Sequence, residues 1–290
     1  MLHVKNILVP VDFSEQTLPM IKYAQTIASR ENASIHLIYV NEMVQMAYSG
    51  SAFSFGLVSF TELEDHISSW ADEQFEKLQA ELDAEIRNRV HIHHIRGRIA
   101  DEIVTFADDN HIDLILMATH SRTAIEELFL GSKTERVIHL THTPMVVMRD
   151  PKTAPVFPPK HILVTTDLSH LSGKVFEPIV SLAKKYNSKI TVLSIDSFED
   201  GFLEKLDPTE LMLLKRPFEA IIENVTFKQE RSIHAVNGIC DYLEHNPDID
   251  MVAMSTHGRT GLSHIMLGST TEAIVRKTSL PIFVIRSNKE

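Results

Sequence analysis

Short apolar runs alternate with amphipathic segments along the whole chain. Runs such as 7–9 and 162–164 are apolar on both faces, which is typical of buried parallel strands. The expected strands are 7–9, 35–40, 90–95, 114–118 and 145–148, and then 162–164, 190–195, 225–230, 251–255 and 282–285. The segments between them carry apolar positions at helical spacing. This alternation predicts an α/β fold with doubly wound parallel sheets.

The pattern occurs twice, in the same order. Segment 6–13 returns at 161–168, segment 117–123 returns at 254–260, and the Leu-Gly-Ser of 130–132 returns at 267–269. A repeat of this length is a duplicated domain rather than a solenoid unit. We therefore predict two tandem domains, each with a five-stranded parallel sheet. The expected ranges are 1–150 for the first domain, 151–159 for a proline-rich linker and 160–290 for the second domain.

Composition narrows the class of protein. The formal net charge is −11, which opposes binding to a nucleic-acid backbone. Cys240 is the single cysteine, so no intramolecular disulfide can form, and a reducing compartment is expected. No apolar run is long enough for a membrane helix, and the chain starts almost directly in a strand, without a signal peptide. We expect a cytoplasmic protein that binds neither nucleic acid nor membranes.

The second half carries small residues where an anion could lie against a helix. Ser255-x-x-Gly258 follows the fourth strand, and nine residues later Gly268-Ser269-Thr270 opens a helix. Glycine lets a backbone approach an anion closely, and the free amides at a helix N-terminus bind phosphate. In parallel sheets, ligands bind at the carboxyl ends of the strands, where these residues fall.

On these motifs the chain resembles the universal stress protein family, whose signature is Gly-x-x-Gly, nine residues, and Gly-Ser/Thr. The resemblance covers both halves nearly end to end. It implies adenine-nucleotide-hydrolase-like domains with flavodoxin-like layering. It also implies a pseudo-dimer in which segment 146–148 lies against 283–285, because single-domain members pair through this strand. The family's nucleotide-binding branch holds ATP, with or without Mg, between the first-strand aspartate, the end of the second strand and the glycine motif.

Carried onto this chain, the resemblance implies a set of nucleotide contacts in each half. In the second half they are Asp167, Ile195, Ser255, His257, Gly258, Arg259, Gly268, Ser269 and Thr270. In the first half the weaker candidates are Asp12, Val40, His120, Gly131 and Ser132. The first half has Ala118 and Ser121 at two of the three family glycines, and Lys133 in place of Thr270. We therefore predict binding mainly in the second half.

Other roles for these residues stay open. Asp12 and Asp167 could cap the turns that follow them, and His120 and His257 could fill space at strand ends. Arg259 could pair with a surface carboxylate instead of a phosphate. The apolar segment 43–60 could be a lid or a partner surface, or could pack over its own domain.

No catalytic machinery is evident in the sequence. It contains no P-loop, no Gly-x-Gly-x-x-Gly and no nucleophile elbow. We expect no catalytic residues, at most slow ATP hydrolysis, and a nucleotide that acts as a structural or signalling ligand in a stress response. The alternative is a nucleotide-independent interaction module that binds a protein partner or a higher homo-oligomer. A third hypothesis is an enzyme that uses ATP to adenylate or phosphorylate a substrate.

Ser14 and Ser169 are placed to cap the first helix of each half. His91 and His93 share one face of a strand, but no cysteine or carboxylate lies near them at ligand spacing, so we expect no metal.

Overall fold

The computed structural model describes residues 3–42, 60–119, 131–168, 172–197, 212, 214–256 and 269–286. The first half contains β1 (Asn6–Pro10), α1 (Thr17–Glu31), β2 (Ser34–Asn41), α3 (Phe60–Ala80), α4 (Ala84–Arg87), β3 (Val90–Arg96), α5 (Ile99–Asp109), β4 (Leu114–Ala118), α6 (Ser132–Leu140) and β5 (Met145–Met148). The second half contains β6 (His161–Thr165), the 3₁₀ segment η2 (Ser172–Val175), α7 (Phe176–Tyr186), β7 (Lys189–Ser197), the 3₁₀ segment η4 (Arg216–Asn224), β8 (Val225–Ser232), α9 (Ala235–His245), β9 (Met251–Ser255), α10 (Ser269–Lys277) and β10 (Ile282–Ile285).

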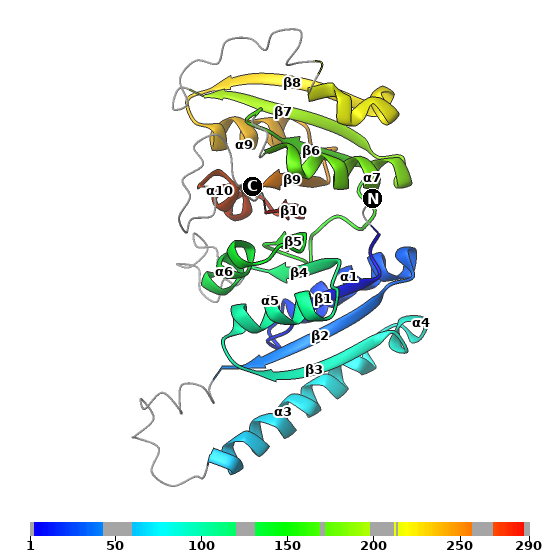
Figure 1. The fold of residues 1–290 in the computed structure, drawn as a ribbon, viewed down its shortest axis with the longest axis vertical. Helices are drawn as coiled ribbons and strands as arrows, with labels where there is room; N and C mark the ends of the chain where they lie inside the picture. Colours follow the sequence, from blue (N-terminus) through cyan, green and yellow to red (C-terminus); the bar gives the residue numbers. More distant parts are fainter. Residues whose placement is uncertain are drawn as a thin grey trace.

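The strands of both halves join into one ten-stranded sheet. Its order is β3-β2-β1-β4-β5-β10-β9-β6-β7-β8, so each half has the order of a doubly wound fold (Figure 1). Within each half the strands pair in parallel, whereas β5 and β10 pair antiparallel with Val146 opposite Phe283. The predicted α/β fold and the predicted pairing of the last strands are confirmed. The two five-stranded sheets are continuous across this joint.

Helices cover both faces of the sheet and create two core layers. One layer combines buried residues of α1, α3 and α7 with one face of the strands, including Ile7 and Val9. The other combines α5, α6, α9 and α10 with the opposite face, including Leu8. The strands are apolar on both faces for this reason, and each fully buried aliphatic side chain contributes about 1.5–3 kcal/mol. None of the helices within the described ranges is long and apolar enough to cross a membrane.

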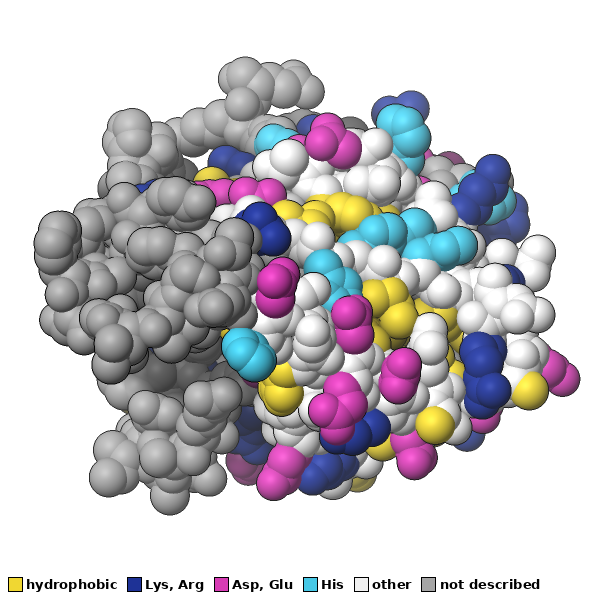
Figure 2. Space-filling model, turned by 90° about the horizontal axis from the view of Figure 1, so that it is seen from below, with side chains coloured by type: hydrophobic (Ala, Val, Ile, Leu, Met, Phe, Trp, Pro, Cys, Tyr) yellow, Lys and Arg dark blue, Asp and Glu magenta, His cyan; other side chains and the backbone are white. Residues whose placement is uncertain are grey.

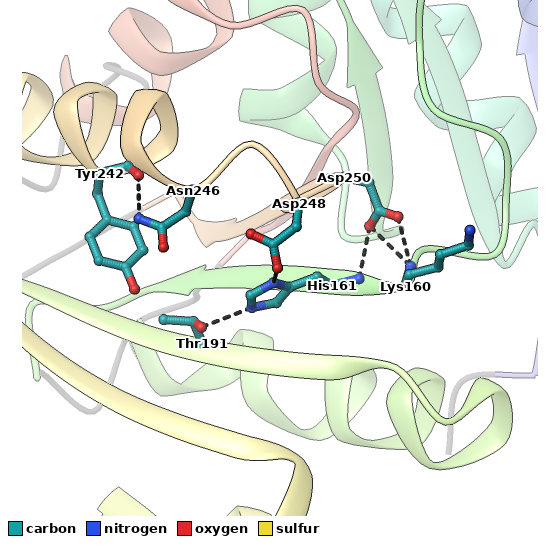
Figure 3. Close-up of polar contacts among 7 residues, drawn as sticks. All are labelled: Lys160, His161, Thr191, Tyr242, Asn246, Asp248 and Asp250. Atoms are coloured by element: carbon teal, nitrogen blue, oxygen red, sulfur yellow. Dashed lines mark hydrogen bonds and ion pairs between the residues drawn. The ribbon is translucent and has the colours of Figure 1, made fainter.

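One carboxylate in each half holds the start of the first strand. Asp113 Oδ2 accepts hydrogen bonds from the amides of Lys5 and Asn6, at 2.7 and 2.9 Å. Asp250 accepts from the amides of Lys160 and His161 in the same way, at 2.8 to 3.0 Å (Figure 3). These bonds tie β1 to the start of β4 and β6 to the start of β9, at the amino edge of each half-sheet.

Partly buried and exposed contacts connect the two halves beside the joint. The Glu31 carboxylate, whose side chain is 6% exposed, accepts from Lys185 Nζ at 2.5 Å and from the Tyr186 hydroxyl. Arg149 Nη1 donates to the carbonyl of Arg276 at 2.9 Å. Because Glu31 lies on α1 and Lys185 on α7, removing either partner should affect both halves.

The expected cap at Ser14 is met in part. Helix α1 begins at Thr17, and Gln16, which precedes it in a helical conformation, makes no side-chain cap bond. Ser14 acts on the turn that leads into the helix, where its Oγ accepts from the Gln16 amide at 3.4 Å and its carbonyl accepts from the Thr17 amide at 3.0 Å. Ser169 lies outside the described residues.

Candidate functional site

A cavity of about 610 Å³ opens at the carboxyl ends of β1, β2 and β4 in the first half. This volume falls within the usual range for small-molecule sites. Four of the predicted residues line it, namely Asp12, Val40, Gly131 and Ser132. The loop after β1, the end of β2 and the start of α6 therefore converge, as the fold class predicts. The predicted His120 and the segment 43–59 lie outside the described residues.

The loop after β1 is held by Asp12 itself. Asp12 Oδ1 accepts from the Ser14 amide and from Thr17 Oγ1, both at 3.1 Å. Phe13 adopts the left-handed region at φ 57°, and Leu168 does so at φ 66° in the second half. Non-glycine residues seldom adopt this conformation, so both halves keep an unusual loop at the same place. Asp12 thus has the turn role considered from the sequence, and it also faces the cavity.

The start of α6 forms the wall opposite this loop. Gly131 precedes the helix with non-helical backbone angles of φ −57° and ψ 129°, and it has no side chain to cap the first amides. Thr134 Oγ1 donates to the Ala118 carbonyl at 3.3 Å, and Thr271 Oγ1 donates to the Ser255 carbonyl at 3.4 Å. The same bond therefore ties the helix start to the end of the fourth strand in each half. We did not identify Thr134 or Thr271 from the sequence, although the repeat places a threonine at both positions.

Two charged residues meet at the mouth of the cavity. Lys133 Nζ lies 3.7 Å from Glu42 Oε2, and the two side chains are 59% and 40% exposed. Gln16 also lines the cavity, and its Oε1 is buried without a hydrogen-bond partner. Glu42 and Gln16 carry no sequence motif, so only the folded structure assigns them to the site.

The second half is described only in part around its predicted site. Asp167 and Ser255 are partly buried at strand ends, and Ile195 is 7% exposed. A Cβ added at Gly238 would lie 2.9 Å from Ile195 Cδ1, so the Ile195 side chain packs against α9. The helix α10 that contains Ser269 and Thr270 is also described. The remaining predicted contacts, His257, Gly258, Arg259 and Gly268, lie outside the described residues.

A polar chain lies at the opposite, amino edge of the second half (Figure 3). His161 Nδ1 donates to Asp248 Oδ2 at 2.8 Å, and its Nε2 lies 2.9 Å from Thr191 Oγ1. The bond from His161 holds the pKa of Asp248 below its usual value. The order carboxylate, imidazole, hydroxyl matches a hydrolase triad. Thr191, however, is only 3% exposed, so its hydroxyl is not available to a substrate. We therefore assign a structural role to these three linked side chains.

Three histidines gather at the outer edge of the first half, on the face covered by α5. His36 Nδ1 lies 3.1 Å from His93 Nε2, and the ring centroids of His36 and His91 are 5.1 Å apart. Figure 2, which looks onto this edge, shows histidine side chains beside an apolar strip. Burial, reinforced by His93 and His91, lowers the pKa of His36 to about 4. Among the described residues, no group of three or more histidine, cysteine, aspartate or glutamate side chains is arranged to hold a metal ion.

The duplicated sheet and its cavity define a tandem α/β protein, and comparison with known proteins gives the family. A model of the universal stress protein family matches residues 3–149 and again 159–286. The chain therefore belongs to the universal stress protein family, in its tandem form.

Individual relatives agree with this assignment. A universal stress protein of Synechocystis is 25% identical over 306 residues, which covers 98% of this chain and 100% of the relative. One from Methanocaldococcus jannaschii is 34% identical over 148 residues, covering 51% of this chain and 84% of the relative. The crystal structure of a universal stress protein from Archaeoglobus fulgidus matches with a TM-score of 0.71 at 17% identity, covering 98% of this chain and 97% of that one. This last likeness concerns the fold alone.

Proposed function

We propose that this protein is a cytoplasmic stress-response protein that binds an adenine nucleotide, ATP in the first instance, at the carboxyl edge of each half-sheet. The observation that carries the proposal is the cavity of about 610 Å³ between the Asp12 loop, the end of β2 and the start of α6. An aspartate, an apolar wall and the amides at a helix start are groups that suit a nucleoside phosphate.

The two ends of the cavity suit the two ends of a nucleotide. Val40 and Ile103 belong to its apolar wall, and Asp12 offers a carboxylate to ligand donors such as hydroxyl or amino groups. Gly131 and Ser132, at the start of α6, offer amides to a phosphate. Base and ribose therefore belong near β1 and β2, and the phosphates near α6.

Tighter binding is proposed for the second half. Its Gly258 and Gly268 match the family motif, whereas the first half has Ser121 in place of the former. A Cβ at this position takes up space beside the phosphate and restricts the backbone. The nucleotide is proposed as a structural or signalling ligand with slow or no turnover, because the sequence contains no P-loop and, in the part of the chain that the structure describes, no group of histidine, cysteine or carboxylate side chains is arranged to hold a metal ion.

The direct test is nucleotide binding by the full-length protein purified without denaturation. Extraction followed by chromatography identifies any co-purified nucleotide, and calorimetric titration with ATP, GTP and adenosine measures affinity. Ligand binding to the folded state should also raise the unfolding temperature as the ligand concentration increases. A folded protein that neither carries nor binds any of these ligands would contradict the proposal.

That outcome would favour the alternative function, an interaction module. The observation behind this alternative is the continuous sheet, in which β5 and β10 already form the internal pseudo-dimer. A folded, nucleotide-free protein that forms a defined higher oligomer, or captures a defined partner, would support it.

A further inference from the structure

We propose that Lys133 makes the first half a phosphate-dependent nucleotide site, which recognises its ligand by charge rather than by a glycine motif. The inference rests on the proposed function and adds the determinant of specificity in this half. From sequence alone, Lys133 is a departure that weakens the site. In the folded protein, Lys133 lies in the first turn of α6 and lines the cavity, where the nucleotide phosphates are proposed to bind.

The charge distribution around the cavity supports this role. Among the described residues that line the cavity, Lys133 is the only lysine or arginine, whereas Asp12 and Glu42 are acidic. Without the lysine, the two carboxylates would repel a nucleotide phosphate. Lys133 is the second residue of α6, so its ammonium adds to the positive end of the same helix.

The ion pair between Lys133 and Glu42 is weak enough for a phosphate to replace Glu42 as the partner of the lysine. Its 3.7 Å separation is long for an ion pair, and both side chains are substantially exposed, so the pair is weak. A phosphate carries more charge than a carboxylate and offers several acceptor oxygens. Lys133 can therefore leave Glu42 for a bound phosphate by a side-chain movement. An adenosine without phosphate would offer nothing for this exchange.

The two halves then recognise phosphate by different chemistry. The second half has Thr270 at the position of Lys133, and it keeps Gly258 and Gly268 for close backbone approach. A lysine acts as a point charge whose effect is screened by salt, whereas backbone amides at a glycine motif impose geometry. Binding in the first half should consequently depend more steeply on ionic strength.

The experiment isolates the first half in the full chain. The background is Gly268→Val, which places a branched side chain in the phosphate region of the second half. Calorimetric titration with ATP and adenosine is then compared for this background, for added Lys133→Thr and for added Glu42→Gln. Lys152→Thr serves as a control, because Lys152 pairs with the exposed Glu15 in the linker region instead of lining the cavity. Circular dichroism and thermal unfolding establish that each variant is folded.

Lys133→Thr should weaken ATP binding about tenfold, as expected for one charge-assisted contact, and leave adenosine binding unchanged. Glu42→Gln should strengthen ATP binding several-fold, because the competing carboxylate is removed. Lys152→Thr should change neither. Equal losses for ATP and adenosine with Lys133→Thr, or no loss for either, would overturn the role of Lys133. If wild type binds ATP but the folded background binds none, the first half is not a site and the inference fails, while the proposed function stands.

Discussion

His36 and Thr191 occupy the same position in the two half-sheets. His36 pairs with Leu8 of β1, and Thr191 pairs with Leu163 of β6, two leucines that the internal repeat equates. The surroundings of the two residues have diverged. His36 stacks on His93 with ring centroids 5.3 Å apart, whereas the Thr191 hydroxyl lies beside His161. The outer edges of the two halves should therefore respond differently to acid.

We expect the first half to lose stability as the pH falls from about 6.5 toward 4. The pKa of His36 is lowered from 6.5 to about 4, and that of His93 is lowered by burial, His91 and His94. Between these pH values the unfolded chain binds more protons than the folded one. The free energy of unfolding therefore becomes smaller as the pH falls. The loss should be about 1–2 kcal/mol, less than the full shift implies because the rings are partly exposed.

His36→Thr should remove much of this acid sensitivity, because threonine is the residue that the second half tolerates at this place. Denaturant unfolding at pH 7 and pH 5 measures the difference. The control is His66→Asn, because His66 is an exposed histidine on α3. Equal pH dependence in wild type and His36→Thr would contradict the assignment.

A second prediction concerns the contact between the halves at Glu31. Glu31→Gln removes the charge that receives Lys185 and the Tyr186 hydroxyl, so we expect a loss of about 1–2 kcal/mol in the free energy of unfolding. Glu15→Gln is the matched control, since Glu15 is 91% exposed and pairs with Lys152 at 3.4 Å. An exposed pair of this kind contributes about 0–1 kcal/mol. Chemical denaturation measures the free energy of unfolding of both variants. Equal losses for Glu31→Gln and Glu15→Gln would contradict the prediction.

Much of the fold could be predicted because strands buried on both faces leave a direct pattern in the sequence. The run 7–9 is apolar throughout, since Ile7 and Val9 face one helix layer and Leu8 faces the other. The pairing of β5 with β10 came instead from the family resemblance. The cap expected at Ser14 acts on a turn before α1, because the loop after β1 uses Asp12 to organise an extra turn ahead of the helix.

The site was predictable only in part, because the rest depends on contacts between distant segments. Asp12 and Gly131 follow from motifs, and the cavity brings them together. The pairing of Lys133 with Glu42 joins the start of α6 to the residue that follows β2, and no local pattern indicates it. His36 was missed for the same reason, since only the register of β2 against β3 places it opposite His91.

The histidines at this edge should not hold a metal. His36 Nδ1 and His93 Nε2 lie 3.1 Å apart, at hydrogen-bond distance. Arg96 and Arg98, which follow His93 along the chain, would however repel a cation. Metal analysis of untagged protein should therefore find less than stoichiometric zinc. Stoichiometric zinc that is lost in a His91→Ala, His93→Ala variant would contradict this prediction.

The last prediction concerns the asymmetry of the two nucleotide sites. Gly268→Val puts a branched side chain where phosphate oxygens should lie against the start of α10. The loss of about two charge-assisted hydrogen bonds, each about 1.5–3 kcal/mol, should weaken ATP binding in the second half about a hundredfold or more. Gly131→Val should change total binding little, because Ala118 and Ser121 already limit the first site.

The reverse change tests the same argument in the other direction. Ala118→Gly combined with Ser121→Gly restores the two family glycines of the first half and should strengthen its binding, because a bound phosphate can then approach the backbone without a Cβ in its path. Calorimetric ATP titration of wild type and the three variants measures both the affinity and the number of sites. Equal damage from Gly131→Val and Gly268→Val would show that the halves contribute equally and would refute the asymmetry. A first site that tightens in the double-glycine variant while the second is unchanged would show that these two side chains, rather than the loss of the pocket, limit binding in the first half.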